Sequence, residues 1–295
     1  MKTKISGKGY TFILADCIDA LELVSSDAVD VVITSPPYNL GISYSTYKDT
    51  RSADDYIQWC LNWGRQLSRV LKEDGSFFLN IGASPSQPAL PHKIALLFEE
   101  IFNLQNTFHW IKSISIERPG SDTISVGHFK PINSYRYVND CHEYVFHFTK
   151  SGKVALDRLA LGVPYQDKSN IKRWAHTEGR DKRCRGNNWF IPYKTIQNKN
   201  KERPHPATFP IQLAENCLRL HGLDKNLLVL DPFVGLGNAA HATANLGIEN
   251  FVGIDLDEAY LETAAKSLQS NPSFNKKLIK GHLSKTSFIP IDTIG

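Results

Sequence analysis

Apolar residues gather in short runs that end abruptly in polar or turn-forming residues, and between these runs they recur at helical spacing. The runs predict buried strands over 10–14, 29–34, 76–81, 107–111, 141–149, 227–230 and 251–255. The helical spacing predicts helices over 53–71, 89–102, 211–220 and 238–246. Strands that alternate with helices in this way are typical of an α/β protein.

The strand over 29–34 ends in Ser35, Pro36, Pro37 and Tyr38, and neither proline can donate a hydrogen bond to a sheet. The chain must therefore leave the sheet at Ser35 as a stiff corner, at a strand end where open α/β sheets bind their ligands. The corner offers a hydroxyl, carbonyl oxygens without competing donors, and a flat ring. These groups suit a planar ring with an exocyclic amino group. The alternative is a proline-rich turn around a buried tyrosine.

The second informative stretch is a strand, a glycine-rich turn, a helix and a further strand over 227–255. Gly235 and Gly237 let backbone amides approach a ligand closely, and the helix start favours a negative group. Asp255 ends the second strand, where a carboxylate suits ribose hydroxyls. Asp231 replaces the first glycine of a dinucleotide-binding turn, so it would repel a pyrophosphate but attract an ammonium group. S-adenosylmethionine, a nucleoside that carries an amino acid, is the ligand that fits.

The segment over 150–203 carries fourteen Lys and Arg against five Asp and Glu, a balance of +9 compared with +4 for the whole chain. Such asymmetry is expected of a surface that contacts nucleic-acid phosphates; the alternative is a solvated, poorly folded insertion. The expected DNA-binding residues are Arg173, Arg180, Lys182, Arg183 and Arg185. Among the charges lie side chains that could touch bases or sugars: Trp174, Asn187, Asn188, Trp189 and Tyr193. The preceding stretch, 112–140, loses periodicity and is expected to be a long loop.

Composition places the chain among ordinary globular proteins. Its 295 residues, 41% hydrophobic and 22% charged, suffice for one large α/β domain with an insertion or for two domains. No apolar run approaches the length of a membrane span, and residues 1–5 begin no export signal, so a cytoplasmic protein without membrane association is expected. The five cysteines are scattered without metal-ligand spacing, so neither zinc nor disulfides are expected.

With these motifs together, the chain resembles the DNA methyltransferases that methylate exocyclic N4 of cytosine or N6 of adenine. Residues 34–38 are similar to the catalytic motif (D/N/S)-P-P-(Y/F) of that family, and residues 231–237 to its cofactor loop D-P-F-x-G-x-G. Residues 71–76 and 205–210 add to the resemblance. The catalytic motif precedes the basic segment, and the cofactor loop comes last. This order resembles the permuted β group of restriction-modification methyltransferases.

The resemblance implies a Rossmann-like α/β fold with a seven-stranded, mostly parallel sheet of the methyltransferase type and an inserted basic target-recognition segment. Residues 1–149 would form the catalytic half of the methyltransferase domain, 150–204 the target-recognition region, and 205–295 the cofactor-binding half. The target base would be held by Ser35, Pro36, Pro37 and Tyr38. The cofactor would be bordered by Asp16, Cys17, Thr208, Phe209, Asp231, Phe233, Gly235, Gly237, Asn238 and Asp255. Taken locally, Asp16 also suits a helix N-cap.

The resemblance further implies direct methyl transfer from S-adenosylmethionine to a base flipped out of double-stranded DNA and stacked on Tyr38, without a metal or a covalent intermediate. Serine at the first motif position is associated in this family with cytosine N4, so cytosine is preferred over adenine N6. A protein or RNA methyltransferase is disfavoured by the motif order, and an inactive DNA-binding relative by the intact Ser35, Tyr38 and Asp231. The sequence leaves open whether a cognate restriction endonuclease exists and whether the protein is a monomer or a homodimer.

Overall fold

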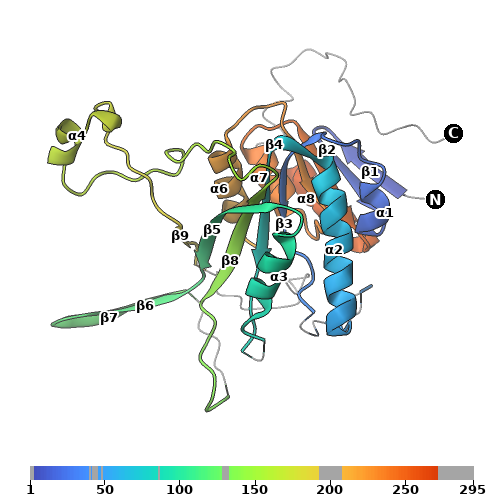
Figure 1. Cartoon of the computed structure of the whole chain (residues 1–295), viewed down its shortest axis with the longest axis horizontal. Coiled ribbons are helices and arrows are strands. Elements are labelled where there is room, and N and C mark those ends of the chain that lie inside the picture. Colours follow the sequence, from blue (N-terminus) through green and yellow to red (C-terminus); the bar gives the residue numbers. More distant parts are fainter. Residues whose placement is uncertain are drawn as a thin grey trace.

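The computed structural model describes residues 3–39, 41, 46–47, 49–85, 87–127, 133–192 and 208–271 of the chain (Figure 1). Within these ranges a nine-stranded sheet runs through the molecule, and a separate hairpin projects from it. In spatial order the strands are β1 (Thr3–Gly7), β2 (Tyr10–Leu14), β11 (Asn250–Asp255), β10 (Leu228–Asp231), β3 (Val29–Thr34), β4 (Leu71–Ile81), β8 (His142–Thr149), β5 (Asn103–Ile111) and β9 (Asn188–Phe190).

Early and late parts of the chain meet in the middle of this sheet. β10 pairs in parallel with β3, with Val229 beside Val31, and β11 lies in parallel between β10 and β2. The pairs β3–β4 and β5–β9 are also parallel, whereas β1–β2, β4–β8 and β5–β8 are antiparallel. The expected α/β class and mostly parallel sheet are confirmed. The described sheet has nine strands rather than seven because the short strands β1 and β9 extend its two edges.

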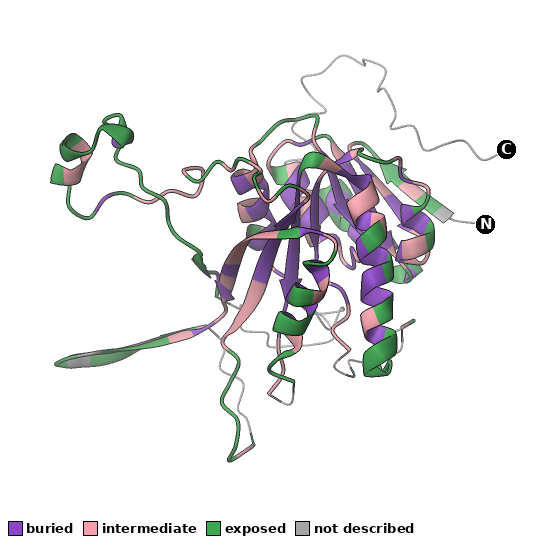
Figure 2. Ribbon diagram, viewed as in Figure 1, coloured by how far each residue is buried: buried purple, intermediate pink, exposed green. Residues whose placement is uncertain are grey.

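The described residues form two hydrophobic cores on opposite faces of the sheet. Within β4, Phe77 and Leu79 join one core and Phe78 joins the other, as the alternation of a strand requires. The first core is covered by α1 (Cys17–Leu21), α2 (Ala53–Val70) and α3 (Leu90–Phe98). The second is covered by α6 (Ile211–His221), α7 (Asn238–Asn245) and α8 (Glu258–Ser270). Figure 2 shows the buried residues concentrated in the sheet and on the helix sides that face it.

The described part of the basic segment, 150–192, extends beyond the edge of the sheet where β5 and β9 lie. It carries α4 (Ser169–Arg173) and the short 3-10 helix η1 (Ala175–Thr177), both far from the sheet in Figure 1. No residue of α4 is buried. The segment returns through β9, where Trp189 is 1% exposed and stacks on Phe108 with ring centroids 4.5 Å apart. The expectation that Trp189 touches bases or sugars is therefore wrong, because its ring belongs to the core.

Several expected elements differ in extent from the structure: the helix expected over 89–102 is α3 (Leu90–Phe98), and the strand expected over 107–111 is β5 (Asn103–Ile111). The long loop expected over 112–140 contains a hairpin of β6 (Ile114–Arg118) and β7 (Ser121–Val126), which projects from the sheet in Figure 1. Its turn uses Gly120, whose φ of 73° is the left-handed backbone that glycine adopts most easily. Strand β4 begins at Leu71, earlier than the expected strand over 76–81, and its pairing with β3 shifts register. None of the helices in the described ranges combines the length and the hydrophobicity of a membrane-spanning segment.

Candidate active site

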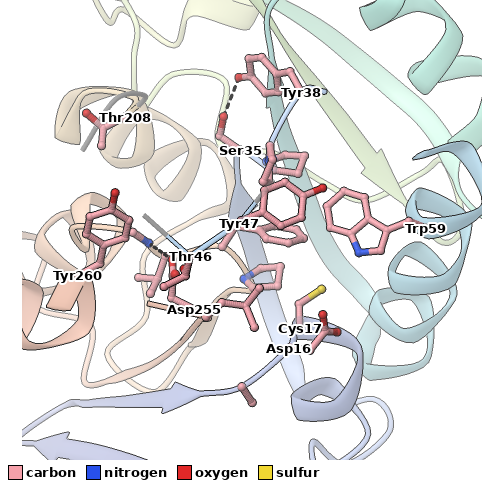
Figure 3. A pocket seen from close by; sticks show the side chains of 18 of the residues that line it. Asp16, Cys17, Ser35, Tyr38, Thr46, Tyr47, Trp59, Thr208, Asp255 and Tyr260 are labelled. Carbon is pink, nitrogen blue, oxygen red and sulfur yellow. Dashed lines mark hydrogen bonds between the residues drawn. The ribbon is translucent and has the colours of Figure 1, made fainter. Parts of the chain in front are cut away.

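A cavity opens at the carboxyl ends of the parallel strands, where several chain segments converge (Figure 3). The chain after β2 and the Ser-Pro-Pro-Tyr corner after β3 supply two sides of it. The turn after β10 and the end of β11 supply two more, and residues before and within α2 and before α6 complete the lining. Figure 3 shows Ser35 and Tyr38 at one end of the cavity and Asp16 and Cys17 at the other. An extended ligand can therefore reach from the early corner to the end of β2.

A buried hydrogen bond joins the two sequence motifs. Thr34, the last residue of β3, donates from Oγ1 to Oδ1 of Asp231 at 2.6 Å, across 197 positions of sequence. The same oxygen accepts the backbone N–H of Phe233 at 3.0 Å. Burial raises the pKa of the Asp231 carboxyl to about 7, although the Thr34 hydrogen bond works against the shift. Asp231 is 1% exposed and is not among the residues that line the cavity; its hydrogen bonds hold the two motifs together.

The glycine-rich turn after β10 is fixed by backbone geometry and by Asp255. Gly235 and Gly237 have positive φ values of 49° and 80°. A Cβ at Gly237 would lie 3.0 Å from Cβ of Ala264, so a larger residue would push α7 away from α8. Asp255 accepts the backbone N–H of Gly235 at 2.8 Å, and burial raises the pKa of its carboxyl.

A second contact ties the turn to the helix that precedes β10. Asn238, at the start of α7, donates from its amide to the carbonyl of Phe209 at 2.6 Å. Phe209 comes just before α6, and both residues line the cavity. The side chain that follows the second glycine therefore positions the chain entering α6.

The cavity has an aromatic wall that the sequence patterns do not indicate. Trp59 of α2 lies with its ring centroid 5.5 Å from that of Phe233 and 6.3 Å from that of Tyr47. The guanidinium of Arg51 lies 5.4 Å from the Trp59 ring centroid, and its Nε donates to the Tyr47 hydroxyl at 3.0 Å. All four side chains line the cavity. Trp59 occupies a helical position with the same spacing as core residues, so no sequence signal separates it from the buried Trp63.

The hydroxyls of the Ser-Pro-Pro-Tyr corner bond to each other and to the neighbouring strand. Ser35 Oγ lies 2.6 Å from the Tyr38 hydroxyl, and that hydroxyl donates to the backbone carbonyl of Asn80 at 3.1 Å. The Asn80 amide donates to the Tyr38 hydroxyl at 3.0 Å. The end of β4 therefore holds the corner that follows β3.

Most of the residues expected to border a cofactor surround this one space. Asp231 and Gly237 are not among the lining residues: Asp231 is buried and bonded to Thr34, and Gly237 is the N-cap residue of α7. The expected residues that line the cavity are Asp16, Cys17, Thr208, Phe209, Phe233, Gly235, Asn238 and Asp255.

The two residues at the end of β2 have local roles as well. Asp16 accepts the N–H of Ile18 at 2.9 Å, which confirms the expected N-cap of α1. Burial raises the pKa of the Cys17 thiol well above its usual range, which leaves the thiol protonated and weakly nucleophilic.

The expected DNA-binding side chains lie apart from this cavity, on the projecting segment. All five are exposed: Arg173, Arg180, Lys182, Arg183 and Arg185. Arg180 pairs with Glu178 at 2.6 Å, and Arg185 donates to the carbonyl of Leu161 at 3.1 Å. Tyr193 and residues 205–207 lie outside the described residues. In the described ranges no group of three or more His, Cys, Asp and Glu side chains is arranged to hold a metal ion.

Known proteins similar to this chain identify its family. The sequence matches the family model N6_N4_Mtase, described as DNA methylase, over residues 29–266. The chain belongs to this family. It is 27% identical to the type II methyltransferase M.HpaI of Haemophilus parainfluenzae over 264 residues, which cover 88% of this chain and 74% of that protein. It is 24% identical to the DNA adenine methyltransferase YhdJ of Escherichia coli (strain K12) over 297 residues, covering 97% and 94% of the two chains.

Solved structures of DNA methyltransferases have a fold similar to that of this chain. The PvuII DNA methyltransferase, described as cytosine-N4-specific, superposes with a TM-score of 0.63 at 17% identity, covering 95% of this chain and 98% of that one. The expected methyltransferase type of the α/β fold is therefore confirmed. Membership in a family of DNA methylases also confirms the resemblance stated from the Ser-Pro-Pro-Tyr and glycine-rich motifs.

Proposed function

We propose that this DNA methylase transfers a methyl group from S-adenosylmethionine to the exocyclic N4 of cytosine in double-stranded DNA. The observation that carries the proposal is the Thr34–Asp231 hydrogen bond, because it brings the Ser-Pro-Pro-Tyr corner and the glycine-rich turn to one cavity. The corner and the turn thereby border the space where a methyl acceptor and its donor would meet. Solved methyltransferases similar to this chain include complexes with S-adenosylmethionine, which supports the choice of donor.

The residues of the cavity fit this donor along its length. The carboxylate of Asp255 suits ribose hydroxyls, and the wall of Trp59 and Phe233 suits a flat, apolar ring. The backbone of the turn beside Gly235 can approach the amino-acid end closely. When bound, the donor supplies a methyl group on a positively charged sulfur. Asp231 accepts a backbone N–H of the turn and so keeps it in place.

The corner prepares the target amine. An aromatic amino group is a weak nucleophile because its lone pair is delocalised into the ring. Hydrogen bonds from its two hydrogens to Ser35 Oγ and to the Pro36 carbonyl favour a tetrahedral nitrogen with its lone pair directed at the methyl group. Positioning and electrostatics of this kind supply most of the acceleration, so no covalent intermediate is needed. The protonated Cys17 agrees with a mechanism without a catalytic thiol.

The DNA substrate would approach the cavity from outside the sheet. A base inside a duplex cannot enter a pocket, so the target base must leave the stack, with Tyr38 as the flat side chain beside it. The exposed basic residues of the projecting segment would hold the phosphates on either side of the target. We place the reaction in the cytoplasm, and the similarity to a type II methyltransferase favours a restriction endonuclease of the same recognition sequence as a partner.

Methylation of adenine N6 is the second candidate, and the similarity to the adenine methyltransferase YhdJ favours it. Serine at the first position of the catalytic motif and the fold similarity to the cytosine-N4-specific PvuII enzyme favour cytosine. The two reactions would use the same cavity and differ in the ring that the corner holds.

The test is to incubate the purified protein with unmethylated genomic DNA and labelled S-adenosylmethionine, digest the DNA to nucleosides and identify the labelled product by mass spectrometry. Labelled N4-methyldeoxycytidine supports the proposal. Labelled N6-methyldeoxyadenosine alone overturns the assignment of the base. Absence of label from DNA of several base compositions overturns methyltransferase activity, with Ser35→Ala as the negative control.

A further inference from the structure

Glu143, near the start of β8, lies beside the catalytic corner although neither motif contains it. Its Oε2 is 3.3 Å from the Tyr38 hydroxyl and accepts the Asn80 amide at 2.7 Å. Its Oε1 lies 3.1 Å from Nζ of Lys112, and the side chains of Lys112 and Glu143 are only 15% and 13% exposed. The carboxylate therefore joins the corner, the end of β4 and the chain after β5 in one polar network.

The chain leaves little room for this carboxylate to move. Gly82 follows β4, and a Cβ at that position would lie 3.0 Å from Cγ and 3.1 Å from Cδ of Glu143. A larger residue at position 82 would crowd the carboxylate and push it away from Tyr38. A charge enclosed in this way is stable only when it is paired and hydrogen-bonded, and here both requirements are met.

We propose that Glu143 is a positioning residue that sets the direction of the hydrogen bonds in the Ser35–Tyr38 pair, an inference that rests on the proposed amino-methyltransferase activity. An ionised carboxylate can only accept, so the Tyr38 hydrogen is directed toward Glu143 and the Asn80 carbonyl. Ser35 must then donate its own hydrogen to the Tyr38 oxygen, 2.6 Å away. Ser35 Oγ also accepts the Asn80 side-chain amide at 3.4 Å, and its second lone pair remains for one hydrogen of the target amine.

The arrangement explains how a serine can serve where related motifs carry aspartate or asparagine. A carboxylate presents lone pairs in every orientation, whereas a hydroxyl presents either a hydrogen or a lone pair. If Tyr38 instead donated to Ser35, the Ser35 hydrogen would face the target amine. Both groups would then present hydrogens, and no hydrogen bond could form between them. Lys112 contributes by holding Oε1, so that Oε2 remains directed at Tyr38 and Asn80.

Glu143→Gln tests this direction because its amide has one accepting and one donating atom. With Lys112 present, the amide oxygen turns to the ammonium group and the NH2 turns to Tyr38. The Tyr38 oxygen would then accept from two NH2 groups, the second from Asn80, so Ser35 could no longer donate to it. We expect the single-turnover rate of methyl transfer to fall about tenfold or more, while the affinity for S-adenosylmethionine and the KM for DNA change by less than about twofold.

The matched control for this variant is Glu262→Gln. Glu262 is an exposed residue of α8 that forms an ion pair with Lys266 on the same helix and is not among the residues that line the cavity. The Glu262→Gln variant loses one negative charge, as Glu143→Gln does, and we expect its methyl-transfer rate to be unchanged.

The double variant Lys112→Met with Glu143→Gln distinguishes the effect of hydrogen-bond direction from the effect of losing the Glu143 charge. Without the ammonium group, the amide can turn its oxygen toward Tyr38, so we expect the double variant to be about threefold or more faster than Glu143→Gln alone. Glu143→Asp keeps an accepting carboxylate and should retain a rate within about fivefold of the unsubstituted enzyme. A rate for Glu143→Gln within about twofold of the unsubstituted enzyme overturns the inference, and so does a double variant as slow as Glu143→Gln.

The two proposals fail separately. If the unsubstituted enzyme does not methylate DNA, the proposed function fails before Glu143 is tested. If it methylates DNA and the Glu143 variants follow the Glu262 control, only the role of Glu143 fails. Should Glu143→Gln not fold, Glu143→Asp still decides the question: a loss of about 100-fold in that variant, with normal S-adenosylmethionine binding, overturns the inference.

Discussion

The carboxyl edge of the sheet and the projecting basic segment are built in opposite ways. At the sheet edge, Thr34, Asp231 and Asn80 are all at most 2% exposed, and their polar atoms bond across different strands. Within the described part of the segment, 150–192, only four residues are buried, and two of these belong to or follow the edge strand β9. Its ion pairs Lys168–Asp181 and Arg180–Glu178 stay inside the segment.

The difference agrees with the roles proposed for the two regions. Methyl transfer needs two reacting atoms held in line with little freedom, which only side chains locked by packing and hydrogen bonds achieve. Phosphate contacts need positive charge within reach, and they tolerate movement because electrostatic attraction falls off gradually. Substitutions at the sheet edge should therefore change chemistry or stability, whereas those on the segment should change DNA affinity alone.

The largest expected effect is the loss of methyl transfer or of cofactor binding when Ser35 or Asp231 at the sheet edge is replaced. Ser35→Ala removes the acceptor that we propose for the target amine, so we expect methyl transfer to fall about 100-fold or more, with S-adenosylmethionine binding unchanged within about twofold. Asp231→Ala removes the acceptor for Thr34 and Phe233 and leaves buried donors unsatisfied, so cofactor binding and about 1–3 kcal/mol of stability should be lost together. Isothermal titration and urea unfolding measure the two quantities.

Asp231→Asn is the matched control for this pair, because its amide oxygen can still accept the Thr34 hydroxyl. It should retain the fold and most of the affinity for S-adenosylmethionine. Equal loss of that affinity in Ser35→Ala and Asp231→Ala would contradict the separate roles.

The next effect tests the segment. The melting temperature and S-adenosylmethionine affinity should not change when its exposed basic side chains are removed, whereas DNA binding should weaken. The slope of log affinity against log salt should fall by about 0.9 for each phosphate contact removed. Fluorescence anisotropy at several salt concentrations provides the slope. The variant replaces five residues together by alanine: Arg173, Arg180, Lys182, Arg183 and Arg185.

A control for that variant replaces three exposed lysines outside the segment, Lys4, Lys8 and Lys225. An unchanged salt slope is expected there. If both variants lower the slope equally, the basic segment is not the DNA-binding surface. The two regions would then differ in structure but not in the functions assigned to them.

The sheet edge is more predictable from sequence than the rest of the molecule because local chemistry constrains its residues. The prolines at 36 and 37 and the glycines at 235 and 237 force a backbone that is recognisable without coordinates. No pattern indicates Trp59 and Glu143, because each shares the spacing of ordinary core or strand positions and gains its place at the cavity or corner from long-range packing. For Trp189 the sequence is misleading in the opposite way. Its basic neighbours suggest a surface position, but β9 pairs with β5 and its ring is buried in the core.

A smaller effect concerns the acid stability of the sheet. His147 is fully buried and accepts from the Asn106 amide at Nδ1, so its ring donates from Nε2 to Ser76. Burial, with a smaller effect of His221, lowers the pKa of His147 to about 3. The folded protein therefore keeps this ring neutral while the unfolded chain binds a proton below about pH 6.5, so stability should fall as the pH drops from about 6.5 to 3.

Urea unfolding between about pH 7 and pH 4 measures this loss, which the single group limits to about 1.4 kcal/mol per pH unit. The raised pKa of Asp231 acts in the opposite direction over part of this range, since the folded state then binds the extra proton. The comparison is therefore with His147→Gln, whose unfolding free energy should depend less steeply on pH. Identical pH dependence in both proteins would exclude His147 as the source.

The smallest effect compares one aspartate from each region. Asp257 is 4% exposed and caps α8 by accepting the N–H groups of Ala259 and Tyr260 at 2.9 and 3.2 Å. Asp181 plays a similar local part in the segment, where it accepts the N–H of Tyr165 at 2.8 Å. Asp257→Ala should lower the free energy of global unfolding by about 1 kcal/mol, the usual value of an N-cap.

Asp181→Ala should leave the free energy of global unfolding unchanged within about 0.5 kcal/mol, because the segment can loosen without exposing either core. Since Tyr260 also lines the cavity, Asp257→Ala should weaken S-adenosylmethionine binding slightly, whereas Asp181→Ala should not. Urea unfolding and isothermal titration of the two variants measure both differences. Equal losses of global stability would mean that the segment unfolds with the sheet as one cooperative unit, and the structural contrast between the regions would then have no counterpart in their stability.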